Sequence, residues 1–82
     1  MTRHLSTLRP GECGIVVQLL THGPIRRRLS DLGFTVGTTV SCLFRSPLGD
    51  PTAYNVKGAV IALRREDADT IVTEIKRRPL WN

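Results

Sequence analysis

"TAYNVKGAVIALR", residues 52–64, is the stretch that most narrows the fold. Two runs rich in apolar and β-branched residues flank Lys57-Gly58, and a two-residue turn at that pair predicts a β-hairpin. We therefore expect Gly58 to be a structural residue of the turn. Apolar residues then meet across the hairpin in two pairs, Val56 with Ala59 and Tyr54 with Ile61.

Three more strands are expected around this hairpin. "CGIVVQLL" (13–20) alternates in character, with one face formed by Cys13, Ile15, Val17 and Leu19 and the other by Val16, Gln18 and Leu20. "TTVSCLFR" (38–45) places three apolar side chains on one side, so that Phe44 is expected to be buried with Val40 and Cys42. "TIVTEI" (70–75) closes the chain as a last strand, after a short helix that begins near Glu66 and Asp67.

"GPIRRRLSDLGF" (23–34) predicts a helix between the first two of these strands. Pro24 suits the first helical position, and Gly33 is a left-handed stop. The spacing puts Leu29 at the centre of an apolar stripe, which consists of Ile25, Leu29 and Leu32.

Three arginines stand in the first turns of this helix, where cations are mildly unfavourable. With the apolar stripe turned inward, Arg26 and Arg27 face outward and Arg28 lies on the flank. Asp31 is within reach of the last two, but one acid cannot neutralise three cations. We expect Arg28 to pair within the fold as a structural residue, and Arg26 and Arg27 to meet an external anion or solvent.

The fold class that follows is mostly β: a small SH3-like β-barrel of about five strands with one or two short inserted helices. A sheet this small gains most from curling, which also removes exposed edges. Residues 1–76 form the single domain, and residues 77–82 (RRPLWN), with Trp81, form a C-terminal tail.

Composition limits the function. The 82 residues carry 12 Lys and Arg against 7 Asp and Glu, a net charge of +5, which favours an anionic partner such as nucleic acid, a membrane surface or an acidic protein face. The same charge can also serve solubility alone. With no long apolar run and no signal peptide, the chain is expected to be cytoplasmic and to have no membrane span.

Catalysis, cofactor binding and metal binding are not expected. There is no nucleophile-elbow serine and no phosphate-binding glycine loop, and His4 and His22 lack an evident partner. Cys13 and Cys42 lie far apart in the sequence on apolar faces, so each is expected to be a reduced core residue rather than a metal ligand. Aromatic residues are few and scattered, which weakens the case for a single-strand nucleic-acid binder.

Four segments in order resemble the FeoA family of small cytosolic proteins of bacterial ferrous iron transport. They are LSTLRPGE (5–12), RRRLSDLGFTVGTTV (26–40), SPLGDP (46–51) and KGAVIALRREDADTIV (57–72). Val36-Gly37 departs from the Pro-Gly common in that family, which affects the rigidity of a turn where Gly37 is a structural residue. The resemblance implies an SH3-like barrel and a non-enzymatic accessory role toward FeoB, the membrane permease with a cytosolic GTPase domain.

FeoB would recruit such a protein to the inner face of the membrane. The residues expected to contact it are two arginines and two residues of the 46–51 loop: Arg26, Arg27, Leu48 and Asp50. Leu48, at the loop tip, can also fold back onto the barrel, and Asp50 can simply fix the loop. Two alternatives stay open, a free-standing basic nucleic-acid-binding barrel and a metal-responsive regulator that resembles the C-terminal domain of iron-dependent repressors. We expect a monomer or a weak homodimer.

Overall fold

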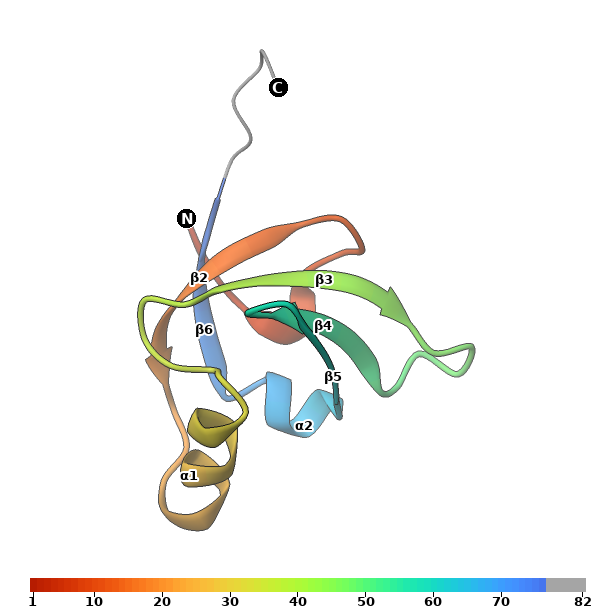
Figure 1. Ribbon diagram of the computed structural model, residues 1–82. Coiled ribbons are helices and arrows are strands. Elements are labelled where there is room, and N and C mark those ends of the chain that lie inside the picture. Colours follow the sequence, from red (N-terminus) through yellow and green to blue (C-terminus); the bar gives the residue numbers. More distant parts are fainter. Residues whose placement is uncertain (77–82) are drawn as a thin grey trace.

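Six antiparallel strands form one sheet, in the order β1-β6-β2-β3-β4-β5, in the computed structural model, which describes residues 1–76 (Figure 1). The strands are β1 (Thr2–His4), β2 (Cys13–Leu19), β3 (Thr39–Arg45), β4 (Thr52–Val56), β5 (Ala59–Leu63) and β6 (Ile71–Ile75). The helices are η1 (Leu5–Thr7), α1 (Gly23–Asp31) and α2 (Arg65–Ala68). The expected tail, residues 77–82 with Trp81, lies outside the described residues.

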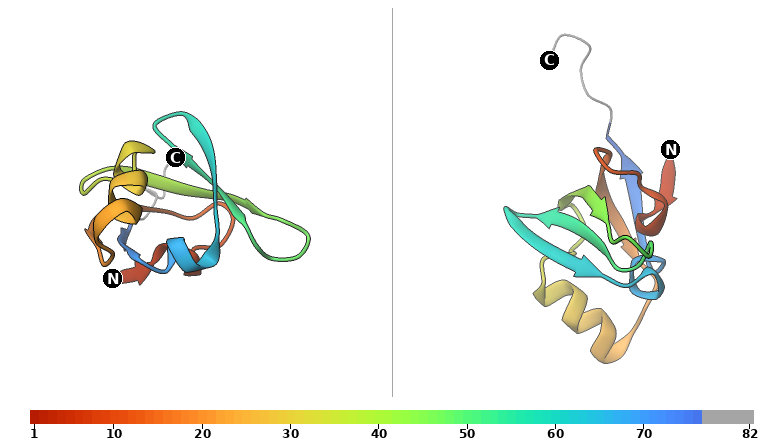
Figure 2. Two further views of the ribbon diagram at one scale, coloured as in Figure 1. Left: turned by 90° about the horizontal axis from the view of Figure 1, so that it is seen from below. Right: turned by 90° about the vertical axis from the view of Figure 1, so that its right-hand side faces the viewer.

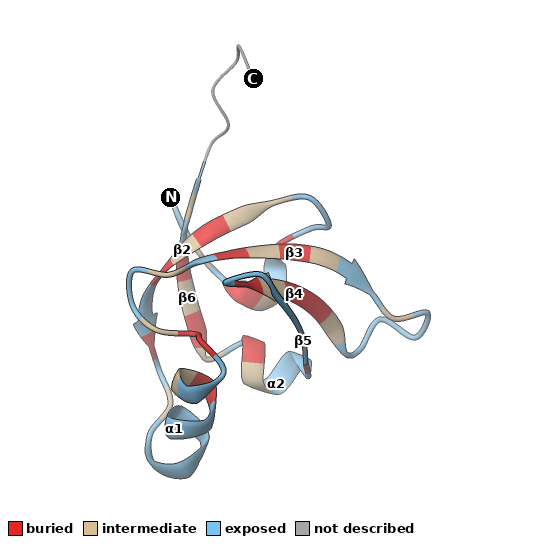
Figure 3. Ribbon diagram, viewed as in Figure 1, coloured by how far each residue is buried: buried red, intermediate tan, exposed pale blue. Residues whose placement is uncertain are grey.

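The sheet curls around the core, and residues near both of its edges, β1 and β5, contribute to that core. Strands β1 and β5 are not paired with each other, and the short helices that follow them, η1 and α2, contact one another. Leu5 of η1 and Ala68 of α2 are fully buried, and the Tyr54 hydroxyl donates a hydrogen bond to the Leu5 carbonyl at 3.4 Å. Figure 3 shows buried stretches on β2, β3, β4, β6 and α2. The predicted curled, mostly β architecture is confirmed.

The number of strands is one higher than expected because β1 was not foreseen. It pairs with β6, with Thr2 opposite Glu74 and His4 opposite Val72. A strand of only three residues, with the sequence TRH, carries no hydrophobic alternation by which the sequence could reveal it.

The hairpin of β4 and β5 has the predicted register, Val56 opposite Ala59 and Tyr54 opposite Ile61. Lys57 and Gly58 have φ values of 52° and 84°, as a two-residue type I′ turn requires. The turn is closed further by the Asn55 side chain, whose Oδ1 accepts the Gly58 N–H at 3.2 Å.

Two β-bulges reverse which side chains face the core. The pairing of β2 with β6 shifts between Val16 and Gln18, so Val16 and Leu19 are both buried while Val17 is exposed. The predicted faces of this strand were therefore wrong beyond the bulge, and Cys13 is only half-buried. A second shift, between Cys42 and Phe44, leaves Cys42 in the core but turns Phe44 outward at 58% exposure, which corrects the expectation of a buried ring.

The C-terminus of α1 packs closely against the hairpin of β4 and β5. Gly33 N–H bonds to the Ser30 carbonyl and Phe34 N–H to the Leu29 carbonyl, the paired bonds of a Schellman motif. Gly33 has φ +111°, and a Cβ there would lie 2.8 Å from Val56 Cγ1. This position therefore requires glycine for both its backbone angle and its space.

Leu29 is the only residue of α1 in the core. It is fully buried, whereas the other two members of the expected stripe, Ile25 and Leu32, are 48% and 36% exposed. The stripe is thus narrower than predicted, because α1 contacts the barrel near its C-terminal end and its first turn extends beyond the sheet (Figure 1).

Candidate functional site

Helix α1 connects β2 to β3 and projects from one end of the barrel (Figure 1). Pro24 occupies its first turn, and no acidic residue lies there to balance the helix dipole. The N-cap residue His22 makes no side-chain capping bond. The first turn of α1 is therefore a surface with an excess of positive charge.

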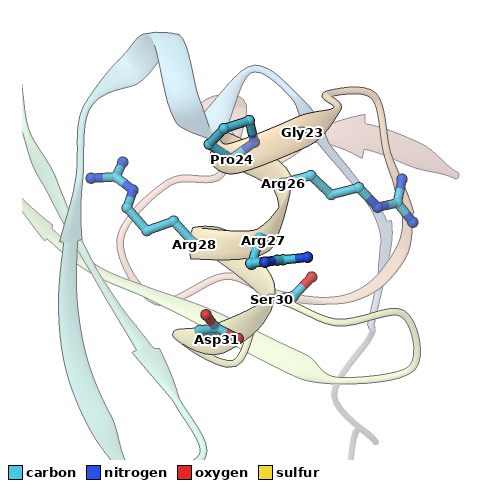
Figure 4. A pocket seen from close by; sticks show the side chains of 7 residues that line it. All are labelled: Gly23, Pro24, Arg26, Arg27, Arg28, Ser30 and Asp31. Carbon is cyan, nitrogen blue, oxygen red and sulfur yellow. The ribbon is translucent and has the colours of Figure 1, made fainter.

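The three arginines of α1 point in different directions (Figure 4). Arg28 Nη2 lies 2.7 Å from Asp67 Oδ2 of α2, so it forms an ion pair inside the fold. Arg26 Nη1 donates to the Leu19 carbonyl at 3.3 Å, a long hydrogen bond to the end of β2. Arg27 forms no ion pair or side-chain hydrogen bond with any of residues 1–76.

Asp31 lies within reach of Arg27 and Arg28 by helix spacing, but neither arginine pairs with it, and Arg28 finds its partner within the fold elsewhere. That guanidinium binds Asp67 instead, because the flank of α1 faces α2, a neighbour that sequence spacing alone could not identify. Asp31 takes part in none of the ion pairs formed within residues 1–76. Asp31 therefore stays available near the cluster, but it neutralises none of the three cations directly.

The outer face of α1 forms an open hollow, drawn in Figure 4. Its lining residues are Gly23, Pro24, Arg26, Arg27, Arg28, Ser30 and Asp31. Arg26 and Arg27, whose guanidinium groups have no carboxylate partner among residues 1–76, border this hollow. Guanidinium groups bind carboxylates through two parallel hydrogen bonds, so the arrangement suits an acidic protein surface.

The other two residues expected to contact a partner lie away from this hollow. Leu48 is 95% exposed at the tip of the loop between β3 and β4, which Figure 1 shows far from α1. The Asp50 carboxylate accepts the Arg65 backbone N–H at 2.8 Å, so it joins the loop to the first turn of α2. The structure thus separates the four residues into the pair Arg26 and Arg27 on α1 and the pair Leu48 and Asp50 on the loop.

Sequence reasoning missed a second group of cations, at the two ends of β5. Lys57 lies in the hairpin turn, and Arg64 and Arg65 follow the strand. All three are exposed, and none forms an ion pair within residues 1–76. Their positions around the predicted hairpin were readable from the sequence, but the exposure of the strand between them was not.

The remaining chemical groups serve the fold. Burial raises the pKa of the Cys42 thiol, so this cysteine is a protected core residue. The Glu12 carboxylate accepts the Arg9 backbone N–H and pairs with Arg3, and these contacts lower its pKa. Across residues 1–76 no three His, Cys, Asp or Glu side chains come together as a metal site needs.

Within the same residues, none of the helices combines the length and the apolar character needed to traverse a bilayer.

Comparison with known proteins places this geometry in context. A Porphyromonas gingivalis protein, a fusion of Fe(2+) transport protein A with the Fe(2+) transporter FeoB, is 35% identical over 71 residues. That match covers 87% of this chain and 8% of the fusion protein, so the chain spans only a small part of that relative.

Solved structures of FeoA proteins have the same fold. A crystal structure of FeoA, an iron uptake regulatory protein, shares 32% identity and a TM-score of 0.85, covering 93% of this chain and 100% of that one. FeoA from Stenotrophomonas maltophilia, a procaryotic SH3 domain protein solved with zinc, shares 31% identity and a TM-score of 0.76, covering 90% of this chain and 89% of that one. The predicted SH3-like class is confirmed.

A manganese-dependent transcriptional repressor shows the same barrel at 20% identity and a TM-score of 0.80, over 92% of this chain and 42% of the repressor, which is a likeness of fold alone. The FeoA domain family matches residues 3–75. With that match over nearly the whole chain, and with the fusion relative beside it, this chain belongs to the FeoA family, which is associated with ferrous iron transport.

Proposed function

We propose that this chain is a non-enzymatic accessory protein of ferrous iron transport that acts in the cytoplasm by binding an FeoB-type permease. The observation that carries the proposal is the P. gingivalis relative, in which a FeoA-like segment and an FeoB transporter belong to one polypeptide. A covalent link holds two domains at high effective concentration, and a separate chain needs a binding surface for the same association.

The surface proposed for this association is the outer face of α1. Arg26 and Arg27 line its open hollow and have no carboxylate partner within residues 1–76, whereas Arg28 is paired with Asp67. An acidic surface on the cytosolic side of the permease would give both guanidinium groups a carboxylate partner. Such contacts chiefly raise the association rate and select the partner, and salt weakens them.

Two charge-reversal variants test this surface. Arg26→Glu with Arg27→Glu is compared with Arg9→Glu with Lys76→Glu, which changes the net charge equally but alters exposed residues outside α1. Tagged protein is incubated with membranes that contain or lack FeoB, and the FeoB retained is measured.

We expect the parent and the control variant to retain FeoB, and the α1 variant to lose most of it with an unchanged melting temperature. Equal retention by both variants would show that the outer face of α1 does not contribute to the interface. No retention by the parent would contradict the proposed function itself.

A further inference from the structure

Strand β5 is an open edge of the sheet. Its one sheet neighbour among residues 1–76 is β4, and the right-hand view of Figure 2 shows no strand beyond it. The opposite edge, β1, is three residues long and carries Arg3. Natural sheets usually protect their edges with charge, proline, a bulge or very short strands. The five residues of β5, AVIAL, have none of these, and their pairing with β4 is regular.

The hairpin register shows which backbone groups of β5 are free. In a two-residue hairpin the pair that flanks the turn, here Val56 and Ala59, exchanges hydrogen bonds, and every second pair does so after it. Ala59, Ile61 and Leu63 therefore bond to β4. The N–H and C=O groups of Val60 and Ala62 point away from β4, toward the open side.

The side chains next to these free groups are apolar and accessible. Val60 is 62% exposed, and Ala62 is exposed as well. Ala62 lies opposite Ala53, which in turn lies opposite Phe44, so the outward-turned Phe44 ring extends the same row across the sheet. An added strand would find both backbone partners and a small apolar surface here.

Cationic side chains stand at both ends of this edge, and at the C-terminal end they share a hollow with Asp50, Glu66 and Asp69. Lys57 precedes β5, and Arg64 and Arg65 follow it, with no ion pair to any of residues 1–76. A second copy of this chain pairing antiparallel through β5 would bring Lys57 of one copy beside the arginines of the other. Like charges side by side oppose that pairing, whereas a segment with carboxylates at both ends is complementary.

We propose that the β5 edge binds an extended segment of the FeoB partner by strand addition, with alternating apolar residues at its centre and acidic residues at both ends. The inference rests on the proposed function for the source of that segment. Five strand residues span about 17 Å, and because the cations lie just beyond β5 at both ends, the acidic ends of the segment must be farther apart than this. The C-terminal end of α1 lies against the hairpin, where Gly33 approaches Val56, so one partner can reach both α1 and β5.

Ala62→Pro tests the edge. Proline removes the outward N–H of Ala62 and, because this group does not bond to β4, leaves the hairpin ladder intact. Ala62→Val is the matched control, since it alters the same side chain and keeps the N–H. Arg64→Glu with Arg65→Glu is a second variant that reverses the charge at one end and, since it adds acids at the start of α2, should fold.

Retention of FeoB from membranes should fall about tenfold or more for Ala62→Pro, whereas Ala62→Val should match the parent. Arg64→Glu with Arg65→Glu should also lose retention, which keeps the test valid if the proline variant does not fold. Full retention by folded Ala62→Pro and by the charge variant would overturn the proposal that the β5 edge binds FeoB, and it would leave the proposed function unaffected. No retention by the parent would instead contradict the proposed function.

A binding measurement without FeoB tests the chemistry of the segment. We would titrate isotopically labelled protein with two synthetic nonapeptides that share an alternating Val-Thr centre, one with Asp and Glu at both ends and one with Lys. The acidic peptide should shift the amide resonances of Val60 and Ala62, and the Lys-flanked peptide should not. The proposal would be overturned by equal shifts with both peptides or by shifts confined to other strands. It would also be overturned if the parent forms a dimer that Ala62→Pro dissociates.

Discussion

Replacing Gly33 by alanine tests how closely α1 is held against the hairpin. Gly33 has φ +111°, and the added Cβ would lie 2.8 Å from Val56 Cγ1, a separation that requires one of the two segments to move. The backbone angle costs an L-residue about 1–2 kcal/mol, and overpacking against the buried Val56 costs about 1–3 kcal/mol more. We expect Gly33→Ala to lower the free energy of unfolding by about 2–5 kcal/mol.

Gly37→Ala is the matched control, because Gly37 has φ +94° but its Cβ would meet no atom within 4 Å. It should show the backbone cost alone, about 1–2 kcal/mol. In a domain of this size the melting temperature should fall by about 20 °C for Gly33→Ala and about 10 °C for Gly37→Ala. Denaturant and thermal unfolding, followed by far-ultraviolet circular dichroism, measure both. Equal losses in the two variants would refute the close contact between α1 and β4.

Three further predictions concern the core. Leu29→Ala should cost about 2–5 kcal/mol of unfolding free energy, because Leu29 is fully buried, and Ile25→Ala on the same helix far less; similar melting curves would contradict this. A thiol reagent should label half-buried Cys13 in the folded protein and reach Cys42 only on unfolding; rapid labelling of both would refute the placement of Cys42. Burial raises the pKa of Tyr54 to about 12, so the midpoint of its ultraviolet titration should lie near that pH. Stability should fall as pH rises above about 10, where the tyrosine of the unfolded chain already ionises, and a midpoint near 10 in the folded protein would contradict its burial.

Local chemistry made much of the fold predictable. The turn at Lys57-Gly58 fixed the hairpin register, because two positive φ values join the strands with one pairing. Gly33 marked the end of α1 for the same kind of reason, since a left-handed cap favours glycine. The acidic start of α2, at Glu66 and Asp67, was likewise visible in the sequence.

Two β-bulges explain why strict alternation assigned side chains of β2 and β3 to the wrong faces. A strict period of two places Phe44 with Val40 and Cys42 in the core, but one extra residue in β3 reverses the side on which Phe44 lies. The shift in β2 likewise buries Leu19, which strict alternation groups with the exposed Val17. No residue type in either strand signals a bulge, so the faces could be assigned only once the partner strands were known.

The candidate site was predictable only where it depends on one helix. The spacing of α1 was enough to turn Arg27 outward, and the structure keeps it free of ion pairs within residues 1–76. The partner of Arg28 lies 39 residues away in α2, a distance that helix periodicity cannot bridge. The open edge at β5 depends on the order of strands in the sheet, which is a property of the whole chain.

Direct binding to FeoB is the central claim, and equilibrium binding to FeoB in lipid nanodiscs tests it most directly. Fluorescently labelled protein is titrated with nanodiscs that contain FeoB and with empty nanodiscs of the same lipid, at low and at high salt. We predict saturable binding to the FeoB nanodiscs alone, with an affinity that falls as salt rises because arginine–carboxylate contacts are screened. Equal binding to both kinds of nanodisc, or binding to neither, would contradict the claim.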